Sequence, residues 1–70
     1  MLSFEPLRKQ LKEKNISIYI FEKQGLIGKA TTTVLRTDNG NVNSSTIHTL
    51  CKYLNCQPGD IMEYIPDEEV

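Results

Sequence analysis

Apolar residues recur at helical spacing in the first part of the chain. Phe4, Leu7 and Leu11 are three or four positions apart, and most of the residues between them are basic or polar. Side chains at this spacing share one face of a helix. Pro6 falls in the first turn, where the N–H that proline lacks would have no helical partner. The pattern predicts a first helix over about residues 5–14, and its basic residues are interpreted as a solvated face.

A second, shorter helix is expected a few residues later. Ser17 is a favourable N-cap residue. Ile16 and Phe21 have the spacing of a hydrophobic staple, in which the residue before the cap packs on the first turn of the helix. Gly25 suits a helix end because glycine adopts a positive φ at little cost. This helix is therefore predicted to begin near Ile18 and to end by Gly25.

The most regular apolar stripe lies farther along the chain. Its members fall at positions i, i+3, i+4 and i+7, which lie on one face of a helix. Asn43 or Ser44 can cap the start of this helix, because both side chains accept a hydrogen bond from a first-turn N–H. The stripe consists of Ile47, Leu50, Cys51 and Leu54.

A short last helix is predicted after a break at residues 55–57. Pro58 suits a first helical position, and Asp60 would meet the positive end of the helix dipole. Pro66 would end this helix, and the acidic tail over residues 66–70 is expected to be solvated. The apolar residues of the helix are Ile61, Met62 and Ile65.

The stretch KATTTVLR, residues 29–36, allows two interpretations. Its β-branched residues and the Asn39-Gly40 pair that follows favour a β-hairpin. The second strand would then be the polar run 41–46, and a lone hairpin is marginal in water. A helix over about residues 29–36 agrees better with its neighbours, although each threonine costs roughly half a kcal/mol relative to alanine. The fold prediction is therefore all-α, a compact bundle of five short helices.

Length and charge narrow the class of protein. A chain of 70 residues predicts one domain over residues 1–70 with a modest core. The net charge is −1, but residues 1–56 carry all eight basic residues against four acidic ones, and residues 57–70 carry five acidic residues and no basic one. Such a basic body fits a protein that touches a polyanion with one face. Without a long apolar run or a secretory signal, a cytoplasmic location and no membrane partner are expected.

The sequence offers little for catalysis or metal binding. Cys51 and Cys56 are expected to be reduced and buried, since nothing indicates export. With His48 they supply three of the four ligands that zinc usually takes, and Cys51 belongs to an apolar stripe. No nucleophile–base pair, paired carboxylates or phosphate-binding glycine loop is visible. We therefore expect no metal, no cofactor, no small-molecule ligand and no enzymatic activity.

The order of these features resembles a known family. A helix, the Ser17 cap, a second short helix, a tight turn and a third helix are followed by STIHTLCKYLNCQPGDIMEYIPDEE. This arrangement resembles the XRE group of Cro and phage-repressor-type helix-turn-helix proteins. The last segment is similar to small stand-alone bacterial members that end in LCxxLxCxxxDIxEYxPDE. The resemblance implies a lambda-repressor-like fold with the helix-turn-helix motif over about residues 18–37.

Most positions of the motif match the family's pattern. Phe21, Ile27 and Leu35 take its apolar positions, and Thr32 takes an inward position that is usually aliphatic. Four other positions differ from the usual residue types of the turn and of the helix starts. The departures are Ile18 in place of a polar residue, Glu22 in place of a small one, Leu26 in place of the turn glycine, and Gly28 in place of a serine cap.

The resemblance also implies that the helix over residues 29–36 is a recognition helix in the major groove. Successive helical residues point about 100° apart, so Thr32 should face the core and Thr33 the DNA. Threonine hydroxyls bond to base edges or phosphates, and apolar groups rest on thymine methyls. Residues in the flanking turns would contact the DNA backbone. The implied DNA-binding residues are Ser17, Gly28, Lys29, Ala30, Thr33, Val34, Arg36, Thr37, Asn39 and Asn41.

The function implied by the resemblance is that of a sequence-specific transcriptional regulator with double-stranded DNA as its partner. The alternative is a protein-interaction module on the same fold, such as an antitoxin or the partner of another regulator, with weak or no DNA binding. Arg36 is expected either to contact a phosphate or to pair with Glu5 or Glu13. A weak homodimer is expected through the C-terminal end, whose apolar residues are Met62, Tyr64 and Ile65.

Overall fold

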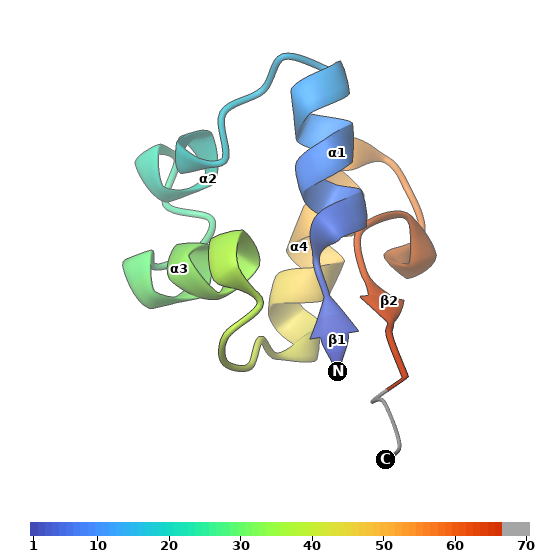
Figure 1. Ribbon diagram of the computed structural model, residues 1–70. Coiled ribbons are helices and arrows are strands. Elements are labelled where there is room, and N and C mark those ends of the chain that lie inside the picture. Colours follow the sequence, from blue (N-terminus) through green and yellow to red (C-terminus); the bar gives the residue numbers. More distant parts are fainter. Residues whose placement is uncertain (67–70) are drawn as a thin grey trace.

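The computed structural model describes residues 1–66, which form a mostly helical fold with a small two-stranded sheet (Figure 1). The helices α2 and α3 lie to one side of α1, and the sheet lies beside the N-terminal end of α1. Apart from Pro66, the predicted acidic tail lies outside the described residues. The elements are β1 (Leu2–Ser3), α1 (Glu5–Glu13), α2 (Tyr19–Lys23), α3 (Lys29–Thr37), α4 (Ser44–Leu54), the 3-10 turn η1 (Pro58–Asp60) and β2 (Glu63–Tyr64).

The predicted helix ends are close to the observed ones. The Asn43 side chain accepts a hydrogen bond of 2.9 Å from the Thr46 N–H and so caps α4. Asn55, with a φ of 54°, follows α4 in the left-handed conformation that commonly ends helices. Gly25, with a φ of 73°, follows α2 in the same way. The helix α2 starts at Tyr19, one residue later than expected.

The stretch KATTTVLR is helical, so the hairpin interpretation is wrong. Its threonines are accommodated because their hydroxyls donate to carbonyl oxygens one turn earlier. Thr32 Oγ1 lies 3.2 Å from the Gly28 oxygen, and Thr33 Oγ1 lies 3.3 Å from the Lys29 oxygen. Thr37 Oγ1 lies 2.7 Å from the Thr33 oxygen. The hydroxyls of Thr32, Thr33 and Thr37 are therefore bonded within the helix itself.

Side chains from every α-helix and from the segment after η1 meet in one core. The aromatic ring of Phe21, fully buried, is met edge-on by Tyr53 at 4.9 Å between ring centroids. Burying such side chains supplies most of the driving force for folding. The core residues are Phe4, Leu7, Leu11, Phe21, Leu35, Leu50, Leu54 and Ile61.

The predicted last helix begins at Pro58 as expected but is only a short 3-10 turn, and the two strands make the all-α description inexact. The segment makes only the single 3-10 turn of η1, closed by reciprocal bonds between Gln57 and Asp60. Ile61 then turns into the core, and the chain continues as β2. The backbone of Ile65 exchanges two hydrogen bonds with Met1, of 2.7 and 2.8 Å. Pairing with the N-terminus thus satisfies backbone groups that a last helix would have bonded internally.

The two strands make an antiparallel ribbon of two residues each. Leu2 lies opposite Tyr64, and Ser3 lies opposite Glu63. Ser3 is buried, whereas the side chains of Leu2 and Tyr64 are exposed. In residues 1–66, no helix has the length and apolar character needed to cross a membrane.

Candidate nucleic-acid interface

The helix α3 presents one face to the core and the other to solvent. Thr32 is 2% exposed and Leu35 is fully buried. Lys29, Ala30 and Thr33 are exposed. The structure therefore confirms that Thr32 points inward and that its neighbour Thr33 points outward. The exposed face of α3 can therefore enter a DNA groove while the buried face stays packed in the core.

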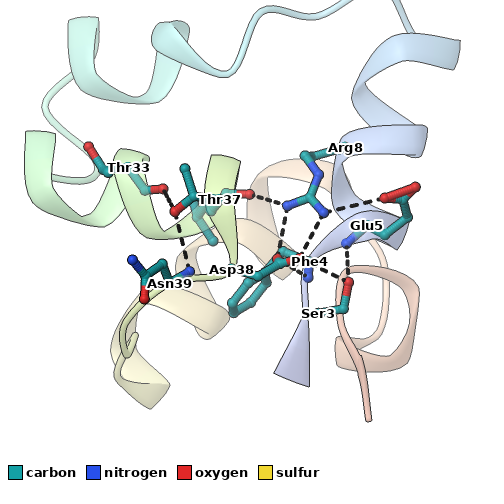
Figure 2. A network of polar contacts seen from close by, with 9 residues as sticks. Ser3, Phe4, Glu5, Arg8, Thr33, Thr37, Asp38 and Asn39 are labelled. Carbon is teal, nitrogen blue, oxygen red and sulfur yellow. Dashed lines mark hydrogen bonds and ion pairs between the residues drawn. The ribbon is translucent and has the colours of Figure 1, made fainter. Parts of the chain in front are cut away.

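The hydroxyl groups on the outer face of α3 differ in their availability (Figure 2). Thr37 Oγ1 donates its 2.7 Å bond to the Thr33 oxygen and accepts a bond of 3.2 Å from the Asn39 N–H. This hydroxyl therefore closes the end of α3 and has no proton left to donate. The 3.3 Å bond of Thr33 Oγ1 to Lys29 is longer and leaves both lone pairs of the hydroxyl open to solvent.

The loop after α3 packs on the flank of the helix. Gly40 has a φ of 132°, and a Cβ there would lie 2.8 Å from Cγ2 of Val34. Val34 is half-buried and packs on the core as well. Only part of the Val34 side chain therefore remains available to DNA. Asn39 and Asn41, in the same loop, are exposed.

Arg36 lies on the side of α3 that faces α2. Its Cζ is 5.8 Å from the ring centroid of Tyr19, within cation–π range. The expected pairing with Glu5 or Glu13 is not formed, and Glu5 instead pairs with another arginine. Ser17, which the family resemblance also places among the DNA-binding residues, accepts a bond of 3.2 Å from the Tyr19 N–H and so supports the start of α2.

A network that the sequence analysis missed anchors the end of α3 (Figure 2). The guanidinium of Arg8 donates to both carboxylate oxygens of Asp38, at 2.9 and 3.0 Å, and to the Leu35 carbonyl at 2.7 Å. Asp38 also accepts from the Phe4 N–H at 2.7 Å and from the Ser3 hydroxyl at 3.3 Å. Two-point pairing of this kind is strong and directional. Arg8 is therefore structural and not part of a solvated face.

The same contacts change the acidity of the two side chains. The Arg8 guanidinium, followed by the Phe4 N–H, lowers the pKa of Asp38 to about 2, although partial burial opposes this shift. The pKa of Arg8 is raised, chiefly by its hydrogen bonds to Asp38. Asp38 occupies the left-handed position after α3, with a φ of 63°. It thus ends the helix and ties it to α1.

One local signal for this network exists in the sequence. Arg8 comes four residues after Phe4 and three before Leu11, which places it at the edge of the buried stripe. A long side chain at that edge buries its stem and directs its charge along the surface. The spacing indicates that Arg8 is partly buried, but it does not identify Asp38 as the partner.

The cysteines do not form a metal site. Residues 1–66 contain no group of three histidine, cysteine or acidic side chains placed to hold a metal ion. Cys51 and Cys56 are free thiols, and both are half-buried, whereas full burial was expected. Burial, together with the neighbouring Cys56 thiol, raises the pKa of Cys51, which disfavours its reactive thiolate.

A short helix, a tight turn and a second helix with small polar and basic side chains on its outer face define a helix-turn-helix DNA-binding domain. Residues 6–67 match the family of Cro/C1-type HTH DNA-binding domains, and the chain belongs to that family. This agrees with the resemblance to XRE-type proteins. The chain is also 33% identical over 60 residues to a Bacillus subtilis (strain 168) protein named "Uncharacterized HTH-type transcriptional regulator YozG". That match covers 84% of this chain and 71% of the other protein. No solved structure matches the chain significantly.

Proposed function

We propose that this protein is a sequence-specific transcriptional regulator that binds double-stranded DNA with α3 in the major groove. The observation that carries the proposal is the division of α3 into a buried face, with Thr32 and Leu35, and an exposed face with Lys29 and Thr33. Membership of a DNA-binding family and a relative named as a transcriptional regulator support it.

The exposed groups of α3 suit two kinds of DNA contact. Thr33 can accept from or donate to base edges once its long bond to Lys29 is given up, and the Ala30 methyl can rest on a thymine methyl. Lys29, at the start of the helix, can reach a guanine or a phosphate. Contacts to bases carry sequence specificity, and contacts to phosphates fix the position of the protein. Backbone contacts are assigned to Ser17, Gly28, Arg36, Asn39 and Asn41. Thr37 can join them by giving up its bond to the Thr33 oxygen, and Val34 borders the base-reading face.

We also propose that two copies pair through the β1–β2 ribbon. Tyr64 is 67% exposed and Ile65 is 43% exposed, and the exposed side chains of Met1 and Leu2 lie beside them. Met62 is half-buried on the core, so it contributes less to this surface than the sequence indicated. Two copies related by a two-fold axis could place their recognition helices in successive major grooves, roughly 34 Å apart.

Binding to DNA is tested by selecting duplexes from a random pool and measuring affinity by fluorescence anisotropy at several salt concentrations. We expect enriched sequences, and an affinity that falls as salt rises because phosphate contacts release counterions. Lys29→Ala should weaken binding. If Lys29 contacts a phosphate, the loss is similar on all duplexes and the salt slope falls by about one unit. The exposed Lys9→Ala, on α1, is the matched control. Absence of binding to any duplex at low salt would instead favour the protein-interaction module.

A further inference from the structure

Two side chains from different helices meet beside the proposed DNA-binding face. Arg36 of α3 is exposed, and its Cζ lies 5.8 Å from the ring centroid of Tyr19 at the start of α2. In the part of the chain that the structure describes, Arg36 forms no ion pair. Its charge is therefore not neutralised by a carboxylate.

Arg8, whose charge is neutralised by Asp38, provides a comparison for Arg36. Its guanidinium donates to Asp38 at two points and to the Leu35 carbonyl, so most of its donors are occupied. A guanidinium over an aromatic ring uses its face for the contact and keeps its N–H groups free at the edge. Arg36 thus retains the donors that bind a phosphate at two points.

The surroundings of the Tyr19 ring are also suited to an anion. A shallow depression of about 300 Å³ is lined by Ser17, Tyr19, Ile20 and Lys23, so its lining combines a serine and a basic residue with the tyrosine. The described residues that line it include no carboxylate. The bond from the Tyr19 N–H to Ser17 Oγ, at 3.2 Å, fixes the backbone from which the ring projects.

We propose that Tyr19 is a positioning residue that holds the Arg36 guanidinium ready to bind a phosphate of the DNA backbone. This inference rests on the proposed function, because the phosphate belongs to the duplex that α3 enters. A free arginine side chain loses rotamer freedom on binding, and a side chain that is already held loses less. Tyr19 therefore raises affinity through Arg36 without contacting a base.

The test is a double-mutant cycle, with affinity and salt slope measured on the selected duplex. Arg36→Ala should weaken binding on all sequences alike and reduce the salt slope by about one unit. Tyr19→Ala should weaken binding about twofold to fivefold, the range for exposed cation–π pairs. Tyr19→Phe keeps the ring and should bind like the wild type. In the double variant, the loss should be no larger than for Arg36→Ala alone, because Tyr19 acts through Arg36.

Several outcomes would overturn this inference while leaving the proposed function intact. They are wild-type affinity in Tyr19→Ala, additive losses in the double variant, or a loss in Tyr19→Phe as large as in Tyr19→Ala. The last result would mean that the hydroxyl itself contacts DNA. If the wild type binds no duplex, the proposed function fails and the inference fails with it. Tyr19 is half-exposed, so thermal melts of all variants should match the wild type.

Discussion

The pair formed by Arg8 and Asp38 positions α3 through two charge-assisted hydrogen bonds. It joins the first helix to the residue that ends α3, and the Phe4 N–H and the Ser3 hydroxyl complete the bonding of the carboxylate. Because both oxygens are used, Asp38 is held in its charged form. Asp38 thus fixes the C-terminal end of α3 relative to α1, in addition to the packing of the buried Thr32 and Leu35.

Replacing this carboxylate should give a stability loss that depends on pH. The pKa of Asp38 is lowered from 3.8 to about 2, so folding favours the ionised form. The resulting stabilisation, about 2 kcal/mol, is complete above pH ~4 and is lost as the pH falls through about 2. Asp38→Asn keeps the size of the side chain and tolerates the left-handed backbone.

We therefore expect Asp38→Asn to unfold at lower urea concentration than the wild type at pH 7, and the difference between the two proteins to shrink toward pH 2. Urea melts over this pH range measure it. Glu5→Gln is the control, since Glu5 reaches Arg8 only through an exposed contact of 3.4 Å. A difference that does not change with pH would show that the charge of Asp38 contributes nothing.

The neighbouring threonines of α3 should respond in opposite ways to substitution. Thr33→Ala should leave the melt unchanged and flatten the preference among operator variants by about 1 kcal/mol or more. Thr32→Val should keep specificity and be neutral or stabilising, because the Gly28 carbonyl keeps its bond of 3.1 Å from the Thr32 N–H. Thr32→Asp should unfold the domain by burying a charge. Similar effects at both positions on stability and on binding would contradict the observed phase of α3.

At the scale of elements, α4 supplies two of the eight core residues. Leu50 is fully buried and Leu54 nearly so. The small core leaves little other apolar area to compensate for a loss, since a domain of this size is only modestly stable. The helix with the most regular apolar stripe in the sequence, α4, is thus also one whose packing the fold depends on.

Leu50→Ala and Leu54→Ala should each destabilise the protein by about 2–5 kcal/mol, as buried truncations do. Urea denaturation followed by circular dichroism measures this loss. Lys52→Ala, on the exposed face of the same helix, should melt within about 0.5 kcal/mol of the wild type. Melts close to wild type for both leucine variants would show that α4 does not pack as described.

How far the sequence predicts the fold depends on whether the signal is local. The phase of Thr32 and Leu35 follows from helical periodicity, and it was predicted correctly. The bond between Arg8 and Asp38 joins positions 30 apart, and no periodic pattern encodes that pairing. The strand β2 was missed for two reasons. The burial of Ile61 does not distinguish a helix from a strand in the residues that follow it. The partner of β2 is β1, which lies at the other end of the chain.

At the scale of the whole molecule, exposed apolar side chains gather on the β1–β2 ribbon. Two-stranded ribbons are marginal on their own and leave unpaired backbone groups at their edges. A second copy placed against Leu2 and Tyr64 would cover both the exposed apolar side chains and the unpaired backbone groups of the ribbon. β1 meets α3 only at its C-terminal end, where Ser3 bonds to Asp38, so pairing there would leave the N-terminal part of both proposed recognition helices free (Figure 1).

We expect the protein to form a weak homodimer, detected by sedimentation equilibrium over a range of concentrations. Tyr64→Ser and Leu2→Ser should each shift the equilibrium toward monomer, because they remove apolar area from the ribbon. Leu26→Ser, which alters an exposed leucine near the end of α2, should not. A protein that sediments as a monomer both free and on DNA would refute the dimer.

The ribbon also has a consequence for how the molecule is made. Met1 and Ile65 are 64 positions apart, so closing the ribbon costs loop-closure entropy, whereas α2 and α3 contact each other as near neighbours in sequence. During synthesis on the ribosome, both helices emerge before β2 exists. We therefore expect contacts between α2 and α3 to begin forming before the ribbon closes, so that the surface proposed for pairing is completed last. Contact with DNA and assembly with a second copy would thus become available at different times.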